Sequence, residues 1–204
     1  MPLPARDSEL VQIVDADLAD ATRRAGSLLA CRIGCTHCCH GAFAINSLDA
    51  ERLHAGMTAL RSSSPLLAAS VERRARTWLA ECGHDFPGDS QTGALSPTPE
   101  DQARFETFAN DAPCPALDTA TGRCDVYAWR PMTCRVFGPP VRAVRPDGTE
   151  GLGHCELCFV DATTEQVAAC EMHVPHELET ELVNEISAEI GTNEETVVAF
   201  ALLR

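Results

Sequence analysis

The chain has 204 residues and a net charge of −14, with 45% hydrophobic and 23% charged residues. This length and composition are those of a globular protein with a core of its own. We expect a single domain spanning residues 1–204, built as one unit or as two closely packed lobes. The acidic balance argues against nucleic acid and against an anionic membrane surface as partners, because both are bound by clustered Lys and Arg.

The N-terminal sequence lacks a basic stretch followed by an apolar core, so we expect no signal peptide. No apolar run approaches the roughly 18 residues that cross a bilayer. We therefore predict a cytoplasmic protein, in which the eleven cysteines stay reduced. A disulfide scaffold is the alternative, and the odd number of cysteines argues against it.

The first half of the chain predicts mainly helices. Apolar residues at three- and four-residue steps predict an amphipathic helix over residues 8–30. A second helix is expected over about 47–60, and a third over 65–81, which has proline at its first position. Residues 83–99 are rich in Gly, Pro, Ser and Asp and indicate a loop or a boundary between lobes, which precedes a short helix over 100–109.

The second half begins with an irregular segment over residues 113–160, in which we expect short strands. Thr121–Gly122 and Asp147–Gly148 are turn signals within it. Two helices then close the chain, over about 175–190 and 194–203. The predicted fold class is therefore mainly α with a small irregular β element, and with helices packed around a cysteine-ligated metal or iron–sulfur site.

The predicted domain divides along the sequence into an N-terminal helix (8–30), a cysteine core (31–158) and C-terminal helices (163–204). Four thiols within nine residues open the core, closer together than packing or a disulfide scaffold requires. A soft metal or an iron–sulfur cluster does require such crowding, because several thiolates must converge on one point. These four residues are Cys31, Cys35, Cys38 and Cys39.

The spacing C-x3-C-x2-C can bring three thiols round one side of a tight loop, which suits the corners of a cubane cluster. The adjacent Cys38 and Cys39 cannot point the same way in a regular element. One of them therefore faces a second site, or reaches the same site through a kinked backbone. Radical S-adenosylmethionine enzymes share this spacing, but a chain that starts with helices and lacks βα alternation does not favour their partial barrel.

A second group of five cysteines completes the cysteine core. Cys155 and Cys158 form a C-x2-C pair, a frequent half-site for zinc and for iron–sulfur centres. With four ligands to a site, the nine clustered cysteines allow at most two sites, either one cluster plus one separate metal or two sites that share the two groups. We expect Cys82 and Cys170 to be buried thiols outside any site. The candidate metal ligands of this second group are Cys114, Cys124, Cys134, Cys155 and Cys158.

Three histidines stand next to these cysteines, so mixed Cys/His ligation is open. For each one, a role at the surface or behind the ligands is favoured over direct ligation. They are His37, His40 and His154.

Four blocks of the cysteine core together resemble a known family. They are the run Cys31–Cys39 and the segments Cys114–Leu117, Gly122–Tyr127 and Arg130–Phe137. This combination resembles the CxxCxxCC or YkgJ-like family, described as a "putative zinc- or iron-chelating domain", over about residues 31–158. The first gap has three residues here instead of the two in the family's name. Bacterial flagellin lysine methylases carry a similar domain, so the resemblance admits an enzyme without requiring one.

Residues between the thiols have expected roles of their own. Arg135 could offset the negative charge of thiolates, or it could form a structural salt bridge. We expect Tyr127 and Phe137 to shield the site from water.

The dense first run favours an iron–sulfur cluster of the 4Fe–4S type over zinc. The predicted function is an accessory or redox protein, with the acidic C-terminal helices as a docking face for a protein partner. A zinc-stabilised interaction module and a cluster-dependent enzyme related to the flagellin lysine methylases are the alternatives, and the sequence indicates no catalytic residue. The docking residues would be Glu177, Glu179, Glu181, Glu185, Glu189, Glu194 and Glu195, although a solvated helix face is the favoured interpretation of this acidic run.

Overall fold

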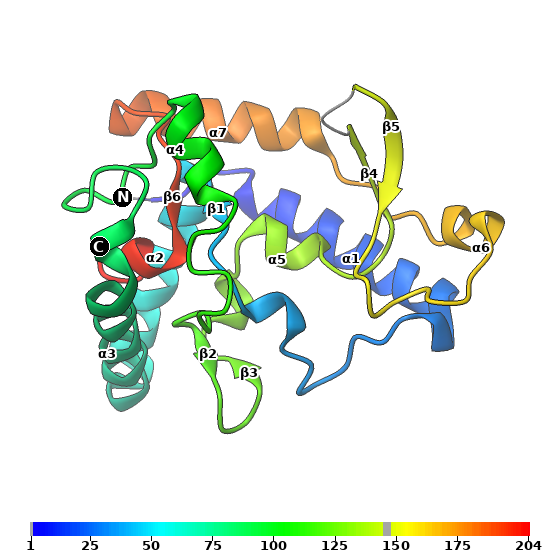
Figure 1. The fold of residues 1–204 in the computed structure, drawn as a ribbon, viewed down its shortest axis with the longest axis horizontal. Helices are drawn as coiled ribbons and strands as arrows, with labels where there is room; N and C mark the ends of the chain where they lie inside the picture. Colours follow the sequence, from blue (N-terminus) through cyan, green and yellow to red (C-terminus); the bar gives the residue numbers. More distant parts are fainter. Residues whose placement is uncertain (1, 145–147) are drawn as a thin grey trace. The chain divides into compact units, whose positions relative to one another are not determined.

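The computed structural model describes residues 2–144 and 148–204 (Figure 1). Helices contain 52% of the residues, and the described residues include three two-stranded antiparallel sheets. The predicted class, mainly α with a small β component, is therefore confirmed.

The chain folds as two compact units, each described here by itself. The expectation of a single domain stays a prediction. Unit 1 comprises Met1–Pro4, Ile33–Pro131 and Val183–Arg204. Unit 2 comprises Ala5–Arg32 and Met132–Leu182.

Two long helices form the frame of unit 1. Helices α2 (Ser47–Ser63) and α3 (Pro65–Cys82) pack side by side (Figure 1). The Asn46 side chain caps α2 by accepting a 2.9 Å hydrogen bond from the Asp49 N–H. Proline occupies the first turn of α3, where its missing N–H costs no hydrogen bond. Both helices agree with the sequence prediction.

The C-terminal end of unit 1 differs from its prediction. Residues 194–203 were expected to be helical, but β6 (Thr196–Val197) pairs antiparallel with β1 (Ala44–Ile45) before the four-residue helix α8 (Val198–Ala201) begins. The β-branched side chains of Thr196 and Val197 favour an extended backbone, and β1 supplies their hydrogen-bonding partner. Helix α8 then packs against α2 and α3.

A short hairpin carries part of the second cysteine group in unit 1. Strand β2 (Leu117–Asp118) pairs with β3 (Arg123–Cys124), and the Gly122 N–H donates to the Asp118 carbonyl at 2.8 Å across the turn. The predicted turn is thus present. Upstream, α4 (Pro99–Phe105) is the expected short helix. The remaining 3-10 turns of this unit are η2 (His37–Cys39), η3 (Gly83–Asp85) and η4 (Tyr127–Trp129).

Unit 2 begins with the predicted N-terminal helix, which is shorter than expected. Helix α1 (Asp7–Ala25) ends where Gly26 takes a φ of 51°, a conformation that glycine adopts readily, and a 3-10 turn, η1 (Gly26–Leu28), follows. Helix α5 (Met132–Val136) packs against α1. These elements lead towards the thiols of this unit.

The rest of unit 2 contains a hairpin and two helices. Strands β4 (Val141–Val144) and β5 (Glu150–Gly153) pair antiparallel; of the predicted turn between them, Asp147 lies outside the described residues. Helix α6 (Thr164–Ala169) starts with a capping box between Thr163 and Gln166. Helix α7 (His176–Ile190) begins in unit 2, and its residues from Val183 onward belong to unit 1.

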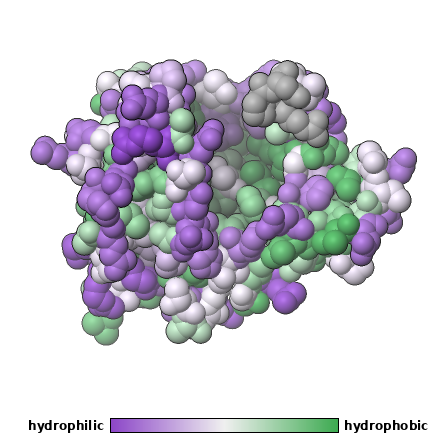
Figure 2. All heavy atoms as spheres, in the orientation of Figure 1, coloured by the Kyte–Doolittle hydropathy of each residue, from purple (hydrophilic) through white to green (hydrophobic). Residues whose placement is uncertain are grey.

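Each unit has an apolar cluster of its own. In unit 1, Leu53, Met57 and Val71 are fully buried. In unit 2, Phe159 packs with buried cysteines. Figure 2 shows many hydrophilic side chains, together with hydrophobic ones, on the face displayed. None of the helices in the described ranges is long and apolar enough to cross a membrane.

Candidate metal centres

The nine candidate thiols divide between the two units. All eleven cysteines of the chain lie within the described residues, and each is a reduced thiol, so no disulfide scaffold is present among them. Unit 1 holds Cys35, Cys38, Cys39, Cys114 and Cys124. Unit 2 holds Cys31, Cys134, Cys155 and Cys158.

In unit 1 the adjacent pair Cys38 and Cys39 lies in a 3-10 turn. The Cys39 N–H donates to the Thr36 carbonyl at 2.8 Å, which kinks the backbone. A hydrogen bond to the sulfur of Cys39 raises the pKa of the Cys38 thiol far above its ordinary value, and burial adds to this shift. The two neighbouring thiols therefore meet, as the kinked-backbone alternative requires.

The first cysteine run and the second group lie side by side in unit 1. The Cys114 N–H donates to the carbonyl of Cys39 at 2.8 Å, and the Gly41 N–H donates to the carbonyl of Ala112 at 2.9 Å. An antiparallel bridge between His40 and Pro113 lies between these two hydrogen bonds. Thiols that are about 75 residues apart in the sequence are thus held on neighbouring strands of backbone.

The hairpin brings Cys124 close to Cys114. Cys124 is opposite Leu117 in the register of β2 and β3, and the Leu117 N–H donates to the Cys114 carbonyl at 2.9 Å. Packing against the core raises the pKa of Cys114 to about 12, and the nearby Cys124 contributes to the increase. Burial also raises the pKa of Cys124. In the absence of metal, both thiols therefore stay protonated, and a bound metal ion would displace the protons.

Arg74 of α3 holds the segment that carries these two thiols. Its Nε donates to the Pro115 carbonyl at 2.8 Å, and its Nη2 lies 2.6 Å from the Asp125 carboxylate. Pro115 follows Cys114 and Asp125 follows Cys124, so one guanidinium secures both ends of the loop. Its positive charge also opposes the rise in the pKa of each thiol.

The loop before Cys35 packs against the turn of the same hairpin. A Cβ at Gly122, where φ is +68°, would lie 2.9 Å from the Cα of Gly34. Glycine is required here because the two backbones touch. This contact brings the residue preceding Cys35 next to the residue two positions before Cys124.

In unit 2 the thiols of Cys31 and Cys158 lie next to each other. Their sulfurs are 4.0 Å apart, and the Ala30 N–H donates to the Cys158 sulfur at 3.3 Å. The predicted C-x2-C pair forms a tight turn, in which the Cys158 N–H donates to the Cys155 carbonyl at 2.9 Å. Cys155 and Cys158 are buried, at 4% and 1% exposed, whereas Cys31 is exposed.

The chemistry of these donors fits a thiophilic metal. Two thiolates on one tetrahedral zinc ion, with Zn–S bonds of about 2.3 Å, would stand about 3.8 Å apart. The 4.0 Å separation in unit 2 is close to this value and is far from that of a disulfide bond. Nowhere in residues 2–144 and 148–204 do three or more His, Cys, Asp or Glu side chains already converge to hold an ion. Binding would therefore require further thiols to rotate toward such a pair.

Comparison with known families agrees with this donor set. Residues 30–145, more than half of the chain, match the CxxCxxCC family, described as a "putative zinc- or iron-chelating domain". The chain belongs to the CxxCxxCC family. Neither a search of curated proteins nor a search of solved structures found a match.

The CxxCxxCC match contains most of the predicted site residues, but it ends before the last two. Cys155 and Cys158 lie beyond residue 145, although Cys158 lies against Cys31, which the match includes. The resemblance inferred from the sequence is therefore confirmed for the CxxCxxCC family. That all nine thiols act as ligands stays a prediction.

Two predictions about residues between the thiols meet different outcomes. Arg135 is 1% exposed and forms a 2.8 Å ion pair with Asp15 of α1, so the salt-bridge alternative is present. Tyr127 and Phe137 were expected to shield the site, but they are 60% and 43% exposed. The Tyr127 ring instead stacks on the guanidinium of the buried Arg130, 3.9 Å from the ring centre.

The histidines next to the thiols are exposed, and two have backbone partners. The Nδ1 of His40 lies 3.0 Å from the Thr36 carbonyl, and the Nδ1 of His154 lies 3.1 Å from the Cys155 carbonyl. His154 also stacks on Phe159. These contacts suit the favoured prediction of a role at the surface or behind the ligands, and direct ligation stays the untested alternative.

Cys170 has surroundings that the sequence did not indicate. It is buried, as expected, but in the same apolar cluster as Cys155 and Cys158. Its distance in sequence from the C-x2-C pair concealed this, and no spacing pattern could have revealed it. Cys82, in unit 1, is half-buried at the end of α3, and burial raises the pKa of its thiol.

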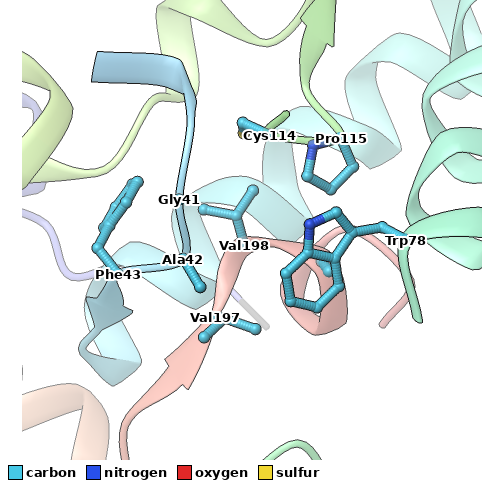
Figure 3. Close-up of a pocket in the computed structure, with 9 residues that line it drawn as sticks. Gly41, Ala42, Phe43, Trp78, Cys114, Pro115, Val197 and Val198 are labelled. Atoms are coloured by element: carbon cyan, nitrogen blue, oxygen red, sulfur yellow. The ribbon is translucent and has the colours of Figure 1, made fainter. Parts of the chain in front are cut away.

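A small cavity adjoins Cys114 in unit 1. Figure 3 shows Cys114 and Pro115 on one side, Trp78 on another, and Val197 and Val198 on β6 and α8. Its volume of about 10 Å³ holds about one water molecule, well below the size of an organic ligand site. The cavity therefore gives no sign of a substrate pocket.

Proposed function

We propose that this CxxCxxCC protein binds an iron–sulfur cluster of the 4Fe–4S type through thiolates of unit 1 and acts as an accessory or redox protein. The observation that carries the proposal is the 2.8 Å hydrogen bond from the Cys114 N–H to the Cys39 carbonyl, which joins the first run to the second group. A bound cluster would supply one-electron transfer. The ligands would come from Cys35, Cys38, Cys39, Cys114 and Cys124.

Five thiols in one unit support a cluster rather than a single ion. A 4Fe–4S cluster takes four cysteines, so the adjacent Cys38 and Cys39 can supply one ligand and leave the other thiol beside it. Four thiolates make such a centre negative. The guanidinium of Arg74, which opposes the rise in the pKa of both Cys114 and Cys124, supplies positive charge near these two thiols. We infer a cytoplasmic location, where thiols remain reduced.

Metal and sulfide analysis of anaerobically purified protein tests the cluster. We expect iron and acid-labile sulfide in nearly equal amounts, broad visible absorption and the Mössbauer signature of coupled irons. The variant Cys82→Ser serves as the control and should keep all three signals. A colourless protein that contains zinc alone would overturn the proposal.

Docking of a basic partner to α7 belongs to the same proposal. Glutamates recur every four residues on this helix and are exposed, and like charges at that spacing cost the helix stability. Arg6 already lies 3.1 Å from the Glu181 carboxylate, and a basic partner would offset the repulsion among the other glutamates. The four residues are Glu177, Glu181, Glu185 and Glu189.

A basic c-type cytochrome is a suitable probe of the docking face. We expect its reduction by the cluster-loaded protein to slow with rising salt, and to slow again in the double variant Glu185→Gln/Glu189→Gln. The matched control is Glu100→Gln/Glu106→Gln, which removes two acidic charges at α4. Equal rates in the two double variants would show that α7 is only a solvated face.

Structural zinc is a second candidate function, favoured by one observation. The 4.0 Å separation of the Cys31 and Cys158 sulfurs in unit 2 suits two ligands of one ion. A zinc ion there would stabilise an interaction module without redox chemistry.

A further inference from the structure

We propose that unit 2 carries a separate metal site, in which Cys31, Cys134, Cys155 and Cys158 bind one zinc ion tetrahedrally. Two of the four ligands lie beyond the CxxCxxCC match, which ends at residue 145. The site does not depend on the cluster proposed for unit 1.

The arrangement of Cys31 and Cys158 is the first support for this site. Their sulfurs are 4.0 Å apart, although 127 positions separate them in the sequence. Cys31 is exposed and Cys158 is 1% exposed. Packing of small apolar side chains would explain a buried thiol, but it does not explain an exposed one held against it. Shared ligation explains both.

The backbone around Cys158 is the second support. The Ala30 N–H donates to the Cys158 sulfur at 3.3 Å, and such hydrogen bonds stabilise a metal-bound thiolate by delocalising its charge. The turn at residues 155–158 closes through the 2.9 Å hydrogen bond from the Cys158 N–H to the Cys155 carbonyl. A C-x2-C turn of this kind presents its two thiols to one ion.

Gly138 is the third support, since it makes room for the Cys31 thiol. Its φ is +126°, and a Cβ there would lie 2.8 Å from the Cys31 sulfur, which is too close for a real contact. The Gly138 carbonyl accepts a 3.2 Å hydrogen bond from the Cys155 N–H. Gly138 therefore lies against the Cys31 thiol and also binds the backbone of Cys155.

Cys134 is the fourth ligand that this geometry points to. It lies on α5, and the chain runs from α5 directly to Gly138. The ion pair between Arg135 and Asp15 anchors α5 on α1, whose end leads to Cys31. Cys170 is the rival, because it shares the apolar cluster of Cys155 and Cys158.

Binding would exchange four thiol protons for one Zn²⁺ ion and release the protons to solvent, leaving a centre of net charge −2. The apolar residues Ala25 and Phe159 pack beside two of the thiols and limit the access of water. No oxidation is involved in this step.

Alkylation of Cys31 in the full chain tests the site directly. Because Cys31 is exposed, its thiol should react rapidly with iodoacetamide after zinc is removed by a chelator. We expect added zinc to slow this reaction at least tenfold, as read by mass spectrometry, and the variant Cys158→Ser to abolish the protection. The same rate with and without zinc would overturn the proposal, as would a Cys31–Cys158 disulfide in protein purified under reducing conditions.

Cobalt substitution identifies the ligands without relying on any one variant. Co²⁺ in the apo chain should give the intense visible bands of a tetrahedral tetrathiolate. Cys134→Ser should weaken and shift them, whereas Cys170→Ser should leave them unchanged. The opposite pattern would overturn the assignment of Cys134. Gly138→Ala, which keeps every thiol, should lower cobalt affinity at least tenfold, and an unchanged affinity would contradict the role of Gly138.

The unit 1 variant Cys114→Ser separates this site from the proposed cluster. It should remove the iron–sulfur absorption and leave zinc protection of Cys31 intact. If protection of Cys31 disappears together with the cluster, the two sites are not separate and the inference fails.

Discussion

Cys114 is held in place by contacts from three parts of unit 1. Its N–H is bound to Cys39, its sulfur packs against the core, and Arg74 holds the next residue along the chain. A thiol placed in this way has little freedom to serve any purpose other than packing or ligation.

Replacing Cys114 with Ser distinguishes these two purposes. If Cys114 is a ligand, Cys114→Ser should lower the iron content of the anaerobically purified protein severalfold, because serine is a poor ligand for a soft metal. Cys82→Ser, at a half-buried thiol of the same unit, should leave iron unchanged. Equal iron in both variants would assign Cys114 to packing.

The raised pKa of Cys114 predicts how the metal-free chain responds to pH. Its pKa is about 12 in the folded state and 9.0 as the ordinary value, so between these values the folded state keeps a proton that the unfolded chain has lost. The free energy of unfolding should therefore fall as the pH rises through this range. Urea unfolding of the metal-free wild type and of metal-free Cys114→Ser measures this. The free energy of unfolding should fall more steeply with pH in the wild type, and a steeper fall in the variant would contradict the prediction.

The positions of single side chains were the least predictable from the sequence. The aromatic character of Tyr127 and Phe137 suggested shielding, but both are substantially exposed, because chemistry alone does not say which way a side chain in an irregular segment points. For Arg135 the sequence left two roles open, and only the folded position of Asp15 on α1 reveals the ion pair.

At the scale of elements, the hairpin β2–β3 positions two of the candidate ligands. Two paired residues on each strand are a marginal structure by themselves. The side chain of Arg74 from α3 supplies additional bonds at both ends, to Pro115 and Asp125.

Removing the Arg74 side chain should loosen this hairpin. We expect Arg74→Ala to cost about 1–2 kcal/mol, since its partly exposed ion pair and backbone hydrogen bond are lost together. Metal affinity in unit 1 should fall in parallel. Arg73→Ala, one position away and exposed, is the matched control. Unfolding curves and iron titrations that are the same for both variants would show that Arg74 does not position the thiols.

The long helices were predictable because their period, caps and prolines lie within one segment. The boundaries of α2, α3 and α7 agree with the prediction for that reason. Strand β6 was missed because its pairing partner, β1, is about 150 residues away, and a local pattern holds no information about such a partner.

At the scale of the whole molecule, each unit brings thiols of the first run next to thiols of the second group. The sequence predicted that distant thiols would gather, since their crowding and spacing indicate shared ligation. It did not predict their division into five and four, because this depends on where the chain passes from one unit to the other, at residues 32–33 and 131–132.

Metal removal should destabilise the chain, because the irregular segments that carry the thiols have few regular hydrogen bonds of their own. Metal present at about 1,000 times its dissociation constant would contribute about 4 kcal/mol. We expect chelation to lower the melting temperature by several degrees, as measured by circular dichroism, and re-addition of metal to restore it. A melting temperature indifferent to chelation would show that the thiols have no structural metal.

X-ray absorption at the iron and zinc edges of anaerobically purified protein tests thiolate ligation most directly. We expect sulfur as the nearest shell at both edges, with a further iron neighbour around iron only. A nearest shell of oxygen and nitrogen at both edges, or a protein that contains neither metal, would contradict ligation by these cysteines.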